Sequence, residues 1–99
     1  MRYEFDWDPA KERANTRKHQ VSFRQATTVF RDPNHLSIFD EAHSTTEDRW
    51  ITLGFDQAGA LGIVIHTFTL IEEERCRIRI ISARKASRAE EKQYHAANR

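Results

Sequence analysis

The 99-residue sequence has few of the residues that build disulfide-bonded, membrane-spanning or secreted proteins. Its single cysteine, Cys76, cannot form an internal disulfide, which fits a reducing compartment. The longest uninterrupted apolar run is Ile63-Val64-Ile65, far short of the roughly 20 residues that a membrane span needs. The N-terminal stretch MRYEFDWD has no apolar core of the kind found in signal peptides. We therefore expect a cytoplasmic protein without membrane segments.

Motifs for metal and cofactor chemistry are also missing. With only three glycines, the chain has no Gly-rich phosphate loop and no serine nucleophile elbow. The five histidines show no H-x-x-x-H spacing, and one cysteine cannot make a C-x-x-C pair. We expect neither a metal ion nor a cofactor.

Charge is plentiful and unevenly distributed. The formal net charge is +1, yet residues 1–74 carry 8 Lys/Arg against 13 Asp/Glu, whereas residues 75–99 carry 8 against 2. A basic segment on an otherwise acidic chain is typical of proteins that bind a polyanion or an acidic protein. A solvated surface that only keeps the protein soluble is the alternative.

The first third of the chain predicts a short strand and two helices. Residues Tyr3–Trp7 alternate as a strand does. The Asp-Pro pair that follows provides an N-cap and a proline at the first helical position, so a helix is expected over Pro9–Lys18. Ser22 can cap a second helix, which should end at Asp32 because the next residue is proline. An apolar stripe at spacings of three and four marks its buried side: Phe23, Ala26, Val29 and Phe30.

The rest of the chain predicts an antiparallel sheet and a last helix. Short turns separate the predicted strands, which favours a four-stranded antiparallel meander. The third strand is apolar on both faces and should be central. Ser87-Arg88-Ala89-Glu90 is a capping-box pattern that opens a C-terminal helix. We expect one α+β domain over residues 1–99. The four strands are predicted at Leu36–Phe39, Arg49–Asp56, Ala60–Leu70 and Arg75–Ala83.

The last predicted strand raises a functional question, because arginine alternates with cysteine or isoleucine in RCRIRI at residues 75–80. If the two N-terminal helices cover one face, Arg77 and Arg79 share the open face with Trp50 and Thr52. Bases stack on aromatic rings and arginine pairs with phosphates, so such a face suits single-stranded RNA. A solvated charged face is the alternative. The rows expected to face the helices are Ile51/Leu53/Phe55 and Ile78/Ile80.

Three stretches of the chain carry a resemblance to a known family. They are FDWDPAKERANTRKHQVSFRQATTVFRDP, EDRWITLG and RIRIISARKASRAEEKQY, and they extend over nearly the whole sequence. The most specific parts are the run W-D-x-x-K-x-x-x-N-x-x-K-H-x-V-S-F and the strand R-I-I-S-A-R. In these residues the chain resembles the BrnT toxins of bacterial BrnT/BrnA toxin–antitoxin systems. It departs from them at Gln20, where the family usually has glycine, and we expect a less tight turn there.

The resemblance implies a RelE-like fold and a metal-independent ribonuclease that inhibits translation. It also implies neutralisation by a BrnA-type antitoxin, through which alone the complex would contact operator DNA. In RelE-like enzymes the RNA 2′-OH attacks the adjacent phosphate, so the protein must move two protons and stabilise negative charge. The predicted catalytic residues are Arg79, Arg84, His66 and Tyr94, with the general base and the general acid left open. The predicted RNA-binding residues are Arg77, Trp50, Lys85 and Arg88.

Several of these assignments have a structural alternative. His66 has the strand parity of Val64 and Phe68, so it can be a hydrogen-bonded core histidine. Tyr94 can pack the last helix onto the sheet, and Glu90 has its place in the capping box. For the whole chain, the alternative function is a non-catalytic RNA- or protein-binding module that uses the same basic face.

Overall fold

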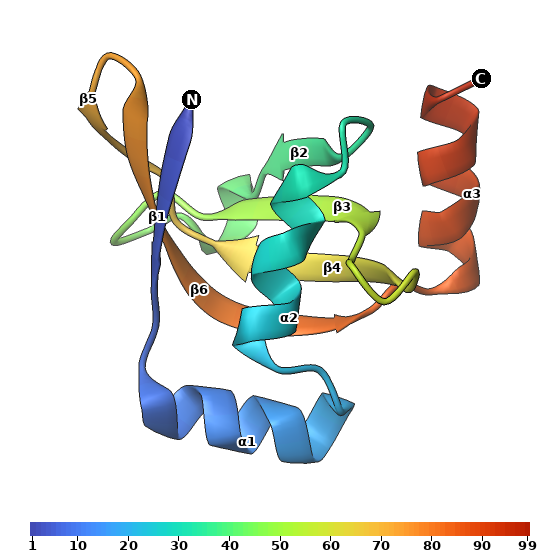
Figure 1. Cartoon of the computed structure of the whole chain (residues 1–99), viewed down its shortest axis with the longest axis horizontal. Helices are drawn as coiled ribbons and strands as arrows, with labels where there is room; N and C mark the ends of the chain where they lie inside the picture. The colour runs from blue at the N-terminus through green and yellow to red at the C-terminus, as the bar shows by residue number, and fades with distance from the viewer.

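The computed structural model describes all 99 residues as a six-stranded sheet with helices on both faces (Figure 1). None of the helices is both long and apolar enough to cross a membrane. The elements are β1 (Arg2–Asp6), α1 (Pro9–His19), α2 (Phe23–Thr27), the 3-10 turn η1 (Thr28–Arg31), β2 (Leu36–Phe39), the 3-10 turn η2 (Glu41–His43), β3 (Trp50–Phe55), β4 (Leu61–His66), β5 (Thr69–Glu72), β6 (Arg75–Lys85) and α3 (Arg88–Ala97).

The sheet has the strand order β1-β6-β4-β3-β2, with β5 also paired to β6. The antiparallel pairs β2–β3, β3–β4 and β4–β6 confirm the predicted meander and the central place of β4. The mixed α+β class is confirmed as well. A further pairing was not predicted: β1 lies parallel to β6, with Arg2 opposite Arg75 and Asp6 opposite Arg79.

One strand prediction is wrong, because the stretch Ala60–Leu70 does not form a single strand. β4 ends at His66, the register against β6 shifts between Ile65 and His66, and β5 begins at Thr69. β5 then pairs back along the first residues of β6. The chain leaves its pairing with the middle of β6 after His66 and returns as β5 along the start of β6. The apolar run is therefore divided between two strands, although its composition is uniform.

The predicted helix signals are confirmed by their hydrogen bonds. The Asp8 side chain accepts from the Ala10 N–H at 2.9 Å, and Ser22 accepts from the Gln25 N–H at 3.0 Å. Ser87 and Glu90 form the complete capping box of α3. α2 is shorter than expected as an α-helix, because its last turn tightens into η1.

The turn after α1 is closed and not loosened, contrary to the expectation for Gln20. Gln20 has φ 59° and ψ 30°, the left-handed conformation that glycine adopts most readily, and its N–H donates to the Thr16 carbonyl at 2.8 Å. The non-glycine residue therefore introduces backbone strain into a turn of ordinary shape.

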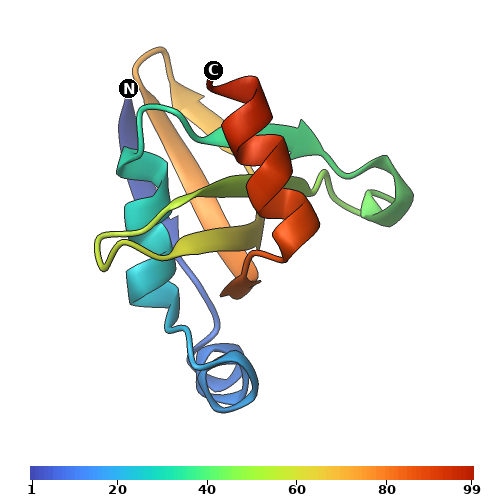
Figure 2. The same ribbon diagram turned by 90° about the vertical axis from the view of Figure 1, so that its right-hand side faces the viewer.

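The sheet carries apolar packing on both faces. α1 and α2 cover one face, here called the helix face, and α3 lies against the other, here called the outer face (Figures 1 and 2). The core of the helix face comprises Val21, Phe23, Ala26, Val29, Phe30, Val64, Cys76, Ile78, Ile80 and Ala83. The smaller core under α3 comprises Leu53, Leu61, Ile63 and Tyr94, with Leu36, Ile51, Phe55 and Ile65 around it.

The predicted assignment of β3 to the two faces is therefore wrong. Ile78 and Ile80 face the N-terminal helices as expected, but the row Ile51/Leu53/Phe55 packs under α3. Residues opposite each other in an antiparallel pair share a face, and Thr52 lies opposite Val64 while Trp50 lies opposite His66. Thr52 and Trp50 consequently belong to the helix face. Because α3 offers a second apolar surface, both alternating rows of β3 are covered.

Candidate functional site

The outer face of β6 carries a row of guanidinium groups, here called the arginine row: Arg77, Arg79 and Arg84. Arg84 is five residues after Arg79, so in a regular strand it would point to the opposite face. His66 lies opposite Ile80 and Ile65 lies opposite Ser82, which makes Ile81 an extra, bulged residue. The bulge returns Arg84 to the face of Arg79. The two side chains are 50% and 43% exposed.

Carboxylates of β1 accompany the first part of this row. The parallel register sets Glu4 beside Arg77 and Asp6 beside Arg79. Arg79 Nη1 lies 3.3 Å from Asp6 Oδ1, and Arg77 Nη2 lies 3.8 Å from Glu4 Oε1. Glu4 makes its closer contact, 2.9 Å, with Arg75. Exposed ion pairs at such distances contribute little to the free energy of folding. Arg77 and Arg79 can therefore exchange a carboxylate partner for a phosphate.

Arg84 is held more firmly, at the junction of β6 and α3. Its two terminal nitrogens donate to the two oxygens of Glu90 at 2.8 and 2.9 Å, and Glu90 Oε1 also accepts from the Ser87 N–H. The hydrogen bond from Arg84 lowers the pKa of Glu90 to about 2, and the same bond raises the pKa of Arg84. The result is an oriented, permanently charged guanidinium whose own nitrogens are partly engaged.

His66 lies on the other side of the sheet from the arginine row and is 2% exposed. Its Nδ1 is 2.9 Å from the Thr67 carbonyl oxygen, which can only accept, so we assign the ring proton to Nδ1. Nε2 then accepts from the Thr52 hydroxyl at 2.6 Å. Burial lowers the pKa of His66, which keeps the ring neutral. This geometry fits the core-histidine alternative better than a proton-transfer role.

Tyr94 is also buried, in the small core between α3 and the outer face of the sheet. Its hydroxyl donates to Asp32 Oδ2 at 2.6 Å, and its ring packs edge-on against Phe55. Burial, together with the neighbouring Asp32 carboxylate, raises the pKa of Tyr94 to about 12. The geometry fits the packing alternative. Of the four predicted catalytic residues, only Arg79 and Arg84 belong to the exposed arginine row. Tyr94 is buried under α3 on the same side of the sheet, and His66 is buried on the helix face.

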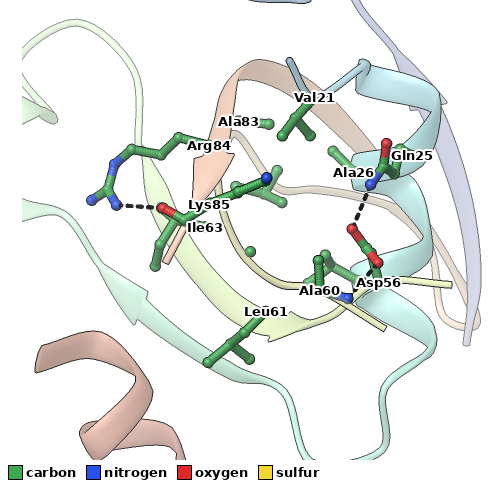
Figure 3. Close-up of a pocket in the computed structure, with 13 residues that line it drawn as sticks. Val21, Gln25, Ala26, Asp56, Ala60, Leu61, Ile63, Ala83, Arg84 and Lys85 are labelled. Atoms are coloured by element: carbon green, nitrogen blue, oxygen red, sulfur yellow. Dashed lines mark hydrogen bonds between the residues drawn. The ribbon is translucent and has the colours of Figure 1, made fainter. Parts of the chain in front are cut away.

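The other predicted RNA-binding residues are divided as well. Arg77 belongs to the arginine row, and Arg88 is exposed at the first turn of α3. Lys85 ends β6 and extends over a small cavity beside α2 (Figure 3). Trp50, expected beside the arginines, lies instead on the helix face, where Phe39 packs edge-on against it. The predicted combination of an aromatic ring with the arginines is therefore wrong.

Two cavities flank the sheet on its helix face. The one in Figure 3 lies between α2 and the strands β4 and β6, and the hydrogen bond from Gln25 to Asp56 closes one side of it. Its volume of about 10 Å³ admits a single water molecule and no nucleotide. A second cavity of about 230 Å³, here called the aromatic pocket, is lined by Tyr3, Phe30, His35, Ser37, Trp50, His66, Phe68 and Ile78.

Two structural residues were not foreseen from the sequence. Asn15 of α1 is buried, and its amide group donates to the Ala83 carbonyl at 2.8 Å while accepting from the Ala83 N–H at 3.1 Å. β1 stops opposite Arg79, so the Asn15 amide replaces a neighbouring strand along the uncovered edge of β6. An asparagine inside a helix, where it is a poor helix former, was the available signal.

Asp32 ties together three parts of the chain. Its carboxylate accepts from the Phe55 N–H at 2.9 Å, from the Asn34 N–H at 2.9 Å and from the Tyr94 hydroxyl. Burial by itself would raise the pKa of Asp32, but these hydrogen bonds outweigh it and the pKa is lowered. From the sequence, Asp32 is predicted only to end a helix.

Comparison with known proteins gives matches to a family model and to solved structures. The model of the family described as "Ribonuclease toxin, BrnT, of type II toxin-antitoxin system" matches residues 7–90, from just before α1 to the first turn of α3. The 1.1 Å crystal structure of the Brucella abortus ribonuclease toxin, BrnT, has a similar fold. Its TM-score is 0.59, with 22% identity over 89% of this chain and all of that one. A comparison with curated proteins finds no match.

Proposed function

Because the chain belongs to the BrnT family of ribonuclease toxins of type II toxin–antitoxin systems, we propose that it cleaves RNA at the arginine row. The observation that carries this proposal is the presence of half-exposed guanidinium groups on one face of β6, at Arg77, Arg79 and Arg84. Guanidinium groups bind phosphate oxygens with two parallel hydrogen bonds. No other surface of the sheet offers such a series.

The proposed reaction is RelE-like and independent of metal. The 2′-OH of one nucleotide attacks the adjacent phosphate, the bond to the 5′-oxygen breaks, and negative charge builds on the phosphate oxygens meanwhile. Arg79 and Arg84 supply fixed positive charge at that point. Arg79 exchanges its long contact with Asp6 for the phosphate, whereas Glu90 keeps Arg84 oriented.

Residues for proton transfer are not brought beside the row. His66 and Tyr94 stay predictions for that role, but both are buried, His66 on the helix face and Tyr94 in the core under α3. Glu90 is ionised at neutral pH and hydrogen-bonded to Arg84. We therefore attribute the larger part of the catalytic effect to charge stabilisation by the arginines.

A protein antitoxin is the partner implied by membership of a type II family. We propose that it is of the BrnA type, that it covers the arginine row with an acidic segment, and that operator DNA is contacted through it alone. An apolar strip adjoins the row, since Ile38, Ile51 and Ile65 lie side by side across β2, β3 and β4, ending at Ser82 of β6. Ile38 is exposed. An acidic amphipathic segment would satisfy both surfaces.

Purified protein incubated with bulk RNA tests the activity. We expect the purified chain alone to cleave the RNA. In cells, we expect expression of the chain to stop translation and growth, and the product of the adjacent gene to restore growth. RNA that is bound and protected but stays intact would identify a non-catalytic binding module instead.

The salt dependence of antitoxin association tests the docking surface. We expect association to slow as salt rises, because exposed charges are screened. An association rate that does not change with salt would assign the contact to the isoleucine strip rather than to the arginines.

A further inference from the structure

The aromatic pocket is a site that the proposed cleavage chemistry does not use. Ile78 lines it from the face of β6 opposite Arg77 and Arg79. Its walls are the rings of Tyr3, Phe30, Trp50 and Phe68. Its volume of about 230 Å³ is below the roughly 300–1,000 Å³ of pockets for drug-sized ligands. A single flat aromatic group is the kind of ligand that such a pocket accommodates.

Two residues that line the pocket, Ser37 and His66, are joined through the buried Thr52 by neutral hydrogen bonds. Ser37 Oγ lies 2.8 Å from Thr52 Oγ1, which donates to His66 Nε2 at 2.6 Å. Because the Thr52 proton is directed at His66, the Ser37 hydroxyl donates to Thr52 and keeps its own lone pairs for the pocket. This part of the pocket lining is therefore polar but uncharged.

Three further residues that line the pocket carry polar groups: His35, Trp50 and Tyr3. His35 Nδ1 lies 2.7 Å from the Asp32 carbonyl and must donate to it, which leaves Nε2 as an acceptor. Trp50 and Tyr3 contribute an N–H donor and a hydroxyl. The lining residues thus combine aromatic rings with hydrogen-bonding groups, a combination that suits a nucleobase, which has a π-face bordered by hydrogen-bonding edges.

Exposed aromatic side chains gather at the same place. Phe68, which lines the pocket, is 41% exposed, and Phe39 beside Trp50 is 40% exposed. Large apolar side chains left in water at a concave site indicate a ligand-binding surface.

We propose that the aromatic pocket binds one unpaired nucleobase of the RNA substrate, stacked on Phe68 and Trp50. This inference rests on the proposed ribonuclease function and deepens it. Since the pocket and the arginine row lie on opposite faces of β6, the base held here belongs to a nucleotide outside the cleaved linkage. The pocket would give the enzyme a preference for sequence near the cut.

Binding of a non-cleavable RNA tests this inference separately from catalysis. A single-stranded oligonucleotide with 2′-O-methyl riboses lacks the attacking hydroxyl and reports affinity only. We expect Phe68→Ala to weaken its binding about 5- to 150-fold, as the loss of one base stacked on an aromatic ring does. Leu70→Ala is the matched control: Leu70 is 58% exposed on β5, two residues away, and does not line the pocket. Its affinity should equal that of the wild type.

A second ligand separates base from backbone. An oligonucleotide of the same length whose sugars carry no bases should bind the wild type and Phe68→Ala equally. Equal binding of the ordinary oligonucleotide by Phe68→Ala and Leu70→Ala would overturn the inference. So would a Phe68→Ala protein that loses antitoxin affinity and keeps RNA affinity, because the pocket would then receive a protein side chain. Cleavage of ordinary RNA by the wild type, measured alongside, shows independently whether the ribonuclease proposal stands.

Discussion

The two faces of the sheet hold polar groups of different kinds. On the helix face, Ser37, Thr52 and His66 are linked by hydrogen bonds and carry no net charge. On the outer face, Arg79 and Arg84 are half exposed, and each has a carboxylate partner. Neighbouring residues of one strand thus lie in different surroundings, because successive side chains point to opposite faces.

Solvation explains why the two faces differ. A buried ionised group loses its hydration and must find a compensating partner, whereas a neutral hydroxyl or imidazole needs only hydrogen bonds. α1, α2 and η1 cover much of the helix face, and the polar groups buried there, Thr52 and His66, are neutral. The part of the outer face that α3 does not cover is open to solvent, so charged side chains such as Arg79 stay hydrated there.

The largest expected effect comes from removing the charges of the outer face. Arg79→Ala and Arg84→Ala should each lower the cleavage rate on the order of 10²–10³-fold, the usual cost of losing one preorganised donor. Both variants should stay folded and still bind the antitoxin. Arg13→Ala is the control, because Arg13 is exposed on α1 and outside the row. Lysine at either site should restore activity only in part, since it cannot donate two parallel hydrogen bonds.

Single-turnover kinetics with a defined RNA would measure these rates, and melting temperatures would verify folding. Full cleavage activity in a folded Arg79→Ala/Arg84→Ala double variant would contradict the proposed mechanism.

On the helix face, the corresponding change should affect stability instead. His66→Ala removes a buried ring and leaves the Thr52 hydroxyl without its acceptor, which should cost about 2–4 kcal/mol in the free energy of unfolding. Denaturant unfolding measures this cost, and activity is compared below the melting temperature. A proton-transfer role predicts the reverse pattern: about 10²–10⁴-fold lower activity at unchanged stability.

A smaller effect is expected where the outer face meets α3. Glu90→Gln should destabilise the protein by about 1–2 kcal/mol at neutral pH, a value reduced for the partial exposure of the Arg84–Glu90 pair. Because the pKa of Glu90 falls from 4.5 to about 2 in the folded protein, this stabilisation is present above pH 4.5. It is lost as the pH falls from about 4.5 towards 2.

Unfolding midpoints of the wild type and Glu90→Gln should therefore converge in that acid range. Glu91→Gln, at the next residue of α3, has no ion pair to lose and serves as the control. Parallel curves for the wild type and Glu90→Gln would show that the pair adds nothing to stability.

The smallest change lies outside both faces, at the end of α1. Gln20→Gly should stabilise the protein by about 1 kcal/mol, because glycine adopts the left-handed conformation of Gln20 without steric cost. Thermal unfolding would detect it as a rise of about 4–8 °C in Tm. Cleavage should be unchanged; a Tm that falls would show that the Gln20 side chain makes a stabilising contact of its own.

Much of the fold could be predicted from the sequence because its signals are local. The Asp8 and Ser22 caps, the capping box at Ser87 and the alternation in β2, β3 and β6 depend on residues within one turn or one strand. The family resemblance carried by Trp7 to Phe23 was equally readable and is confirmed by the family match. For the site, the sequence predicted the arginines of β6 but not their partners.

The remainder depended on contacts between distant residues. The parallel pairing of β1 with β6, which sets Asp6 beside Arg79, spans almost the whole chain. The hydrogen bonds of Asn15 with Ala83 and of Asp32 with Tyr94 are also long-range. No local pattern specifies such pairs.

The sequence by itself determined most of the elements, their order and the family, but not the division between β4 and β5, since capping, periodicity and motif spacing are properties of neighbouring residues. Only the tertiary structure decided which face each strand row occupies. Two apolar layers compete for β3, and a single bulged residue, Ile81, determines that Arg84 joins Arg79. A shift of one residue exchanges the faces of a strand, so the packing of the helices and the pairing of the strands place Trp50 at the aromatic pocket and the arginines on the outer face.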